Sequence, residues 1–226
     1  MGFFVNKSEG LPLLRGKIHL YLIFIVPLLM PLFYEPDLER EYLTVYMISF
    51  ICCFCNFAAS ATLHYRSWST NVLSVLRRID YAGIFLMIGG SGLPSAMVMM
   101  NNDFTVLLVL LHWIVVLVGA IGSLVFDFCK TSKPFRVFIY CSVSGPYFLL
   151  LYRLYLRGCY VGVWTSLLGI LSYGLGGLMY AYHFPEIAPG IFGYHEMFHL
   201  FCVFGLVGTF STNLITVKNR HIYSLA

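Results

Sequence analysis

The chain has 226 residues, of which 59% are hydrophobic and only 11% charged, against about 25% charged residues in an average soluble domain. A soluble fold of this length needs a large polar surface, which 14 Lys and Arg and 10 Asp and Glu side chains cannot supply. This composition excludes a soluble enzyme, a coiled coil and a disordered chain. It predicts an integral, multi-pass membrane protein, and the small net charge of +4 gives no basic patch for nucleic acid.

Seven apolar stretches are long enough to cross the hydrocarbon core as helices, which takes about 20 residues each. The predicted spans are 18–34, 42–63, 80–100, 104–126, 136–154, 160–182 and 196–217. The stretches are continuously apolar and do not alternate with period two, so a β-barrel is not expected. We therefore predict an all-α seven-helix transmembrane bundle.

The distribution of Lys and Arg between the loops predicts the orientation. With a cytosolic N-terminus, nine basic residues fall inside and five outside, so the C-terminus is expected on the extracellular or lumenal side. The predicted organisation is a short cytosolic segment 1–17, one transmembrane domain 18–217 and a C-terminal tail 218–226. The sequence leaves open whether the membrane is the plasma membrane or an internal one.

Ionisable side chains inside a membrane are costly and usually mark function. His64 closes the second predicted span, Asp80 opens the third, and His195 and His199 open the seventh. On the predicted topology all four lie at cytosolic ends. Three helices are therefore expected to bring metal-binding side chains to one layer of the membrane.

The spacing of these residues favours a metal site. His195 and His199 are four residues apart, which places both imidazoles on one helix face, and Ser60 and His64 have the same spacing. Two histidines from one helix and one from another make the three-histidine site of a catalytic zinc, with a fourth position for water, whose pKa falls to about 7. We predict that Asp80 holds or deprotonates this water and that Ser60 hydrogen-bonds it or an oxyanion.

Simpler interpretations exist for the same residues. An Asp at a helix start is typical of an N-cap, and a histidine at the end of a span is typical of the headgroup level. A histidine pair with this spacing also occurs as a structural pair. The remaining histidines lack a partner at useful spacing and are interpreted as packing or interface residues: His19, His112, His183 and His221.

Residues 195–199 also read H-E-x-x-H, the helix motif of zinc metalloproteases in which the glutamate is the general base. An intramembrane protease is therefore an alternative. No Asp or Glu follows Glu196 in the chain, so the further ligand must come from upstream, where His64 is the best candidate.

Three segments together resemble a known family. Residues 60–64 (SATLH) match its S-x3-H motif, residues 78–91 (RIDYAGIFLMIGGS) resemble the opening of its third helix, and residues 192–201 (FGYHEMFHLF) are similar to its closing motif F-G-x-H-E-x-x-H-L-F. This is the progestin and adipoQ receptor family, which includes adiponectin receptors and bacterial haemolysin III-like proteins. The short N-terminus and the short loop before the seventh span look more like the haemolysin III branch.

The resemblance implies seven helices with a cytosolic N-terminus, zinc on His64, His195 and His199, and an Asp80 that acts through water. Family members are associated with hydrolysis of ceramide-type amides, and others with receptor signalling or scaffolding. Residues 90–94 (GSGLP) replace the more aromatic or Thr-rich turn common at this position, which leaves the acyl substrate open.

The leading hypothesis is a zinc-dependent lipid amide hydrolase of ceramidase type, with a membrane lipid or sphingolipid as substrate. A second hypothesis is a receptor or scaffold, responding to an unidentified ligand, in which zinc only joins spans two, three and seven. A third is a pore-forming, haemolysin-like protein, against which the scarcity of polar stripes along the spans argues.

Overall fold

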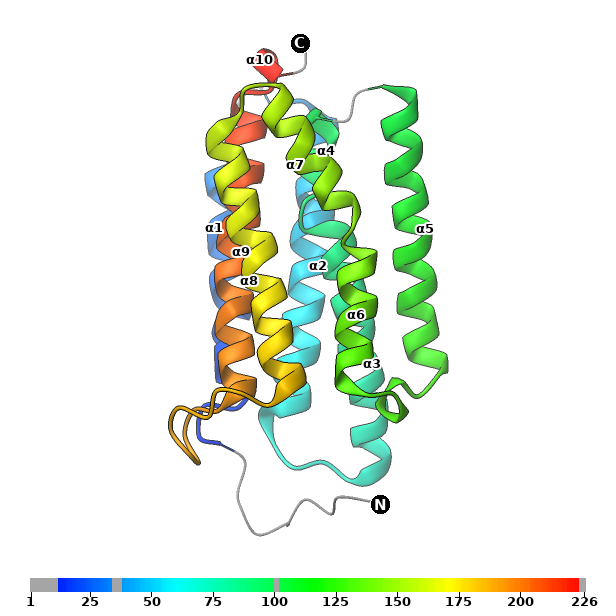
Figure 1. Ribbon diagram of the computed structural model, residues 1–226, viewed down its shortest axis with the longest axis vertical. Coiled ribbons are helices and arrows are strands. Elements are labelled where there is room, and N and C mark those ends of the chain that lie inside the picture. Colours follow the sequence, from blue (N-terminus) through cyan, green and yellow to red (C-terminus); the bar gives the residue numbers. More distant parts are fainter. Residues whose placement is uncertain (1–11, 34–37, 100–101, 224–226) are drawn as a thin grey trace.

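The computed structural model describes residues 12–33, 38–99 and 102–223, and in these residues the regular elements are helices. The α-helices are α1 (Lys17–Leu29), α2 (Arg40–Tyr65), α3 (Thr70–Gly90), α4 (Leu93–Met99), α5 (Asp103–Val125), α6 (Lys133–Val143), α7 (Pro146–Leu156), α8 (Tyr160–Tyr182), α9 (Tyr194–Lys218) and α10 (Arg220–Tyr223). Two 3₁₀ turns, η1 (Met30–Phe33) and η2 (Phe128–Lys130), join them. The long helices run side by side along the molecule (Figure 1).

Within the described residues, six helices or helix pairs are long and apolar enough to cross a membrane: Arg40–His64, Thr70–Met99, Asp103–Val125, Lys133–Leu156, Tyr160–Tyr182 and Tyr194–Lys218. The first predicted span, 18–34, forms a shorter apolar helix over Lys17–Leu32, below the usual span of about 20 residues. The structure therefore confirms an all-helical bundle, and its described residues contain six candidate membrane spans. The seventh crossing and the orientation of the termini stay predictions.

The start of the third span differs from the prediction. The sequence predicts that the span begins at Asp80, but α3 begins at Thr70, because hydropathy marks only the apolar part of a helix whose first turns carry Arg77 and Arg78. Asp80 lies ten residues inside α3, so the N-cap interpretation of this residue is wrong.

The fifth predicted span, 136–154, is a pair of helices. α6 ends at Val143 and α7 begins at Pro146, because proline has no backbone N–H to continue the hydrogen-bond ladder of the preceding helix. At the other end of the chain, part of the predicted tail 218–226 is helical. α10 is anchored where Arg220 Nε donates to Glu39 Oε2 at 2.7 Å, just before α2.

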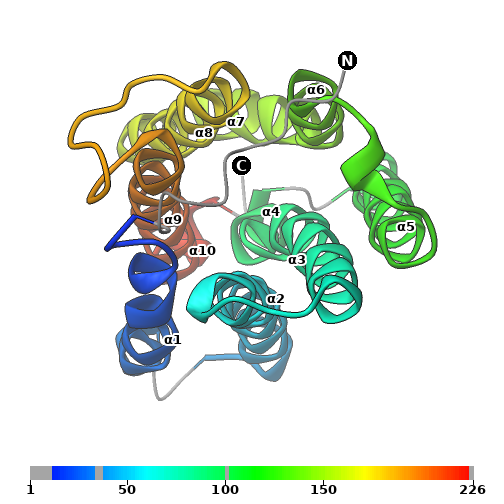
Figure 2. The ribbon, with the colours of Figure 1, turned by 90° about the horizontal axis from the view of Figure 1, so that it is seen from below.

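The helices form a ring in chain order, seen from one end in Figure 2. α1 packs against α2 and α9, α2 against α3, α3 against α5, α6 and α7 against α8, and α8 against α9. α8 and α9 approach closely at Gly169 and Gly208, where glycine has no side chain in the way. A Cβ atom on Gly208 would lie only 2.6 Å from the Gly169 nitrogen. α1 packs beside the ends of α2 and α9 that carry the predicted metal ligands.

Candidate metal centre and cavity

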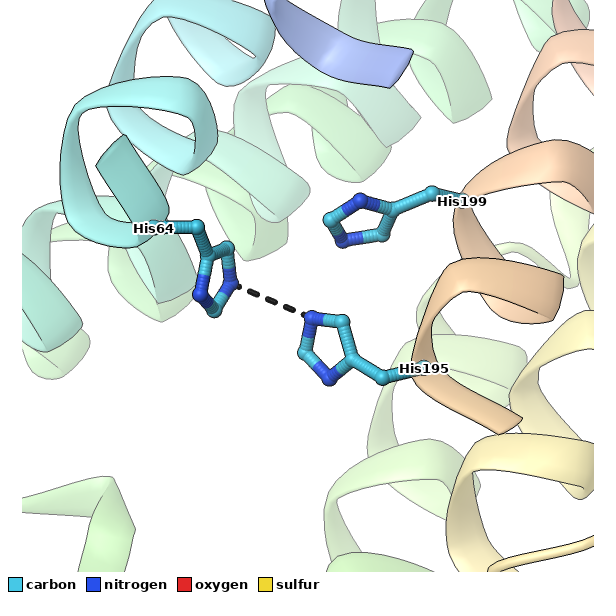
Figure 3. Close-up of side chains that lie close together, drawn as sticks. All are labelled: His64, His195 and His199. Atoms are coloured by element: carbon cyan, nitrogen blue, oxygen red, sulfur yellow. Dashed lines mark hydrogen bonds between the residues drawn. The ribbon is translucent and has the colours of Figure 1, made fainter. Parts of the chain in front are cut away.

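Three imidazoles predicted to bind a metal converge in the structure. His64 lies near the end of α2, and His195 and His199 occupy the first two turns of α9. One ligand atom from each lies within 4.8 Å of the others. Figure 3 shows the rings turned toward one another, with His64 Nε2 and His195 Nε2 3.1 Å apart.

This arrangement fits a metal with nitrogen ligands. Zinc–nitrogen bonds of about 2.0–2.1 Å hold tetrahedral ligand nitrogens about 3.4 Å apart, close to the His64–His195 distance of 3.1 Å. His199 is 2% exposed and its ring centroid lies 4.6 Å from that of His195. Small rotations of these rings would complete a three-nitrogen site, so the group could hold a metal ion.

Asp80 and Ser60 lie beside the histidines. Ser60 is 3% exposed and stands one helical turn before His64 on α2, and its hydroxyl interacts with the Asp80 carboxyl group of α3. Both residues line the same cavity as the three histidines. The structure thus brings together all five residues singled out from the sequence, while the role of each stays a prediction.

Glu196, the central acid of the H-E-x-x-H sequence, is engaged elsewhere. It is fully buried, and its Oε2 accepts a hydrogen bond from the Gly193 backbone N–H at 2.9 Å. Its Oε1 accepts from Arg15 Nε just before α1, and the residue is absent from the cavity wall. With both oxygens bound in this way, Glu196 lacks the placement of a metalloprotease general base.

The segment before α1 closes this end of the bundle. The Leu13 and Leu14 backbone N–H groups donate to Gly190 and Ile191 in the loop before α9, at 3.0 and 3.2 Å. Gly16 has φ of +75°, and a Cβ atom there would lie 2.6 Å from the His64 Cβ. Glycine therefore serves both the left-handed turn and the close approach to His64.

A fourth histidine lies against the site, although sequence reasoning interpreted it as a packing residue. His19 of α1 is 3% exposed, and its ring stacks on His199 with centroids 3.8 Å apart. Neither ring nitrogen has a hydrogen-bond partner among the described residues. The signal in the sequence is weak, because the contact joins α1 to α9, which are far apart in the sequence, and leaves no local spacing pattern.

Near the same end of the bundle, Lys133 of α6 links α8 to α9. Its Nζ lies 2.7 Å from His183 Nε2 and 4.5 and 4.8 Å from the ring centroids of Tyr180 and Tyr194. Burial, and then the Lys133 ammonium group, lower the pKa of His183, which favours the neutral imidazole that can accept a hydrogen bond from Lys133. This cluster holds together the start of α6, the end of α8 and the start of α9.

The three candidate metal ligands lie on the wall of a cavity of about 440 Å³. The cavity runs between α2, α3, α6, α7, α8 and α9, and most of its lining is apolar. Between α7 and α8 the lining includes Phe148, Leu171 and Leu175, which are 61%, 58% and 47% exposed. The cavity therefore reaches the lipid-facing surface of the bundle between these helices.

The turn that departs from the resembled family pattern shapes this cavity. Tyr147 of α7 donates from its hydroxyl to the Ile88 carbonyl at 2.7 Å and accepts from the Gly92 N–H at 2.9 Å. A Cβ atom on Gly92 would collide with the Tyr147 ring. Gly92 thus makes room for an aromatic side chain that comes from α7.

Comparison with known families agrees with this geometry. The profile of haemolysin-III-related proteins matches residues 11–210, which include the three candidate metal-binding histidines and most of the residues that line the cavity. The resemblance found in the three sequence motifs is thereby confirmed at the level of the family. The chain belongs to the haemolysin-III-related family of integral membrane proteins.

Proposed function

We propose that the protein is a zinc-dependent lipid amide hydrolase of ceramidase type. The observation that carries this proposal is the convergence of His64, His195 and His199 beside Asp80 on the wall of a mostly apolar cavity. A zinc ion held by three histidines supplies a Lewis acid that activates water for attack on a carbonyl carbon. A three-imidazole set with no acidic ligand is typical of zinc rather than of magnesium or calcium.

Asp80 and Ser60 account for the proton transfers. In amide hydrolysis, water adds to the acyl carbon and the carbon–nitrogen bond breaks, so that the water loses a proton and the leaving amine gains one. In this proposal Asp80 accepts the first proton and delivers it to the amine nitrogen, as a general base that then acts as an acid. The Ser60 hydroxyl orients the Asp80 carboxylate through the contact between the two side chains.

The cavity accounts for the substrate class. Apolar walls bind an acyl chain through burial of its surface, and the histidines hold the amide at one end of the chain. The exposed lining at Phe148, Leu171 and Leu175 supports lateral access from the bilayer between α7 and α8. A substrate dissolved in the membrane then reaches the site without crossing water.

Turnover of a fluorescent N-acylsphingosine by purified protein tests this proposal. Asp80→Asn keeps the size of the side chain and removes the base, so we expect turnover to fall by about 100-fold or more while zinc stays bound. Asp103→Asn, at the exposed start of α5, is the matched control and should keep full activity. If the wild-type protein binds zinc but cleaves no amide, the alternative with a purely structural zinc replaces the hydrolase.

A further inference from the structure

The deeper part of the cavity contains polar atoms that the proposed chemistry does not use. Among the described residues, Asn56 Oδ1 and the Tyr173 hydroxyl are buried with no partner in hydrogen-bond geometry, and both residues line the cavity. The Thr209 side chain lies next to the Tyr173 oxygen and donates to the Gly205 carbonyl, which leaves the phenol O–H of Tyr173 as a donor. Burying a polar group without a partner is costly, because the group loses its hydrogen bonds to water.

The His19 ring nitrogens and the Tyr140 hydroxyl, at the His199 and Asp80 end of the same cavity, also lack a partner among the described residues. Away from that end, the pair formed by Asn56 and Tyr173 indicates a ligand that completes their hydrogen bonds.

Asn56 extends the face of α2 that carries the site. It lies four residues before Ser60 and eight before His64, so all three side chains share one face of the helix. At 1.5 Å per residue, Asn56 lies about 12 Å from His64 along the helix. It is 3% exposed, and within the part of the chain that the structure describes its amide nitrogen donates to the weak acceptor Met87 Sδ at 3.2 Å.

Tyr173 occupies a different wall at a similar depth. It belongs to α8, and its ring covers Gly205 of α9, where a Cβ atom would lie 2.6 Å from ring carbons Cε1 and Cζ. Gly205 follows His199 by six residues, which is about 9 Å along α9. α2 and α8 lie on different sides of the ring of helices (Figure 2), so the two polar groups face the cavity from separate walls.

We propose that Asn56 and Tyr173 bind a hydroxyl group on the chain of the bound lipid, at about 9–12 Å from the head group at the histidines. A hydroxyl group donates to the Asn56 oxygen and accepts from the Tyr173 phenol at the same time. A charged group at this depth would be too costly. The inference rests on the proposed function for the place of the head group, and it adds a substrate class, lipid amides whose acyl chain carries a hydroxyl group near its middle.

Binding of three fatty acids to the full-length protein in detergent tests this site. The probes are stearic acid, 2-hydroxystearic acid and 10-hydroxystearic acid, in which the hydroxyl lies at about the required distance from the carboxylate. We expect the wild-type protein to bind 10-hydroxystearic acid about five- to tenfold more tightly than the other two, as one or two added hydrogen bonds allow.

Two variants and one control test whether Asn56 and Tyr173 cause the preference for 10-hydroxystearic acid. Tyr173→Phe keeps the ring over Gly205 and removes only the hydroxyl, and Asn56→Leu removes the amide at similar volume. Each should abolish most of the preference and change the affinity for stearic acid by less than about twofold, since one hydrogen bond is lost. Tyr152→Phe, at a residue that is 57% exposed and outside the cavity wall, should keep the preference.

Equal binding of the three probes by the wild-type protein would overturn the proposal and assign the two groups to a bound water. If Tyr173→Phe lowered the affinity for all three probes equally, the proposal would also be overturned, because the tyrosine would then act through shape alone. His199→Ala separates this proposal from the proposed function. The His199→Ala variant should bind all three probes more weakly by a similar factor and keep the preference for the 10-hydroxy acid, even if no amide is hydrolysed.

Discussion

Glu196 and Asp80 show how two acids near the same histidines acquire different surroundings. Glu196 lies between the two histidines of α9, yet its carboxylate turns to the Gly193 N–H and to Arg15. Asp80 is distant in sequence from His195, yet it lines the cavity beside it. The local motif therefore identifies the histidines, whereas the acid that accompanies them comes from another helix.

Glu196→Gln tests the structural role of this residue. The change removes the charge that pairs with Arg15, and a hydrogen bond to a charged group is worth about 1.5–3 kcal/mol. We expect a lower melting temperature in detergent, with zinc content and amide turnover per folded molecule unchanged. A variant that folds with wild-type stability but has lost turnover would contradict this assignment and restore Glu196 as a catalytic base.

At the scale of the helices, the residue before α1, Gly16, packs directly against His64 at the end of α2. The left-handed backbone at Gly16 and its contact with His64 place Arg15 beside Glu196. The segment therefore connects the first helix to both helices that supply the candidate metal ligands.

Gly16→Ala tests this contact. A left-handed alanine costs about 1–2 kcal/mol, and its Cβ would also displace His64, so we expect lower stability together with a lower zinc content. Gly158→Ala is the matched control, because Gly158 has φ of +68° and a Cβ there would meet nothing within 4 Å. Equal zinc content in the two purified variants would contradict the proposed fit between α1 and the site.

The sequence allowed the helices to be predicted better than their ends. Continuous hydropathy located six of the spans, but it could not place the start of α3, where the helix continues past Arg77 and Arg78 to Thr70. The spacing of four residues predicted the shared faces of Ser60 with His64 and of His195 with His199. The stacking of His19 on His199 and the approach of Arg15 to Glu196 depend on how α1 packs, which no local pattern encodes.

At the scale of the whole molecule, the ring of helices encloses one cavity that joins the candidate metal centre to the lipid-facing surface. Helix α8 contributes Gly174 to the cavity wall, and a Cβ atom there would meet nothing within 4 Å. The open space at this position makes it suitable for a side chain that fills the cavity without disturbing the helices.

Gly174→Trp should therefore block the acyl-chain cavity and lower amide turnover, with zinc content unchanged, because the histidines lie on other helices. Gly122→Trp is the control on α5, where a Cβ would also meet nothing within 4 Å and which does not line the main cavity. Full turnover by Gly174→Trp in vesicles would show that the lipid does not occupy this cavity.

The most direct test of the account is the metal content of the purified protein, measured without chelators for the wild type, His64→Ala and His199→Ala. His221→Ala, in α10 at the opposite end of the bundle (Figure 1), serves as the control. The account predicts about one zinc per chain in the wild type and in the control, and loss of zinc in both site variants. A wild-type protein without zinc, or site variants that retain it, would contradict the metal centre.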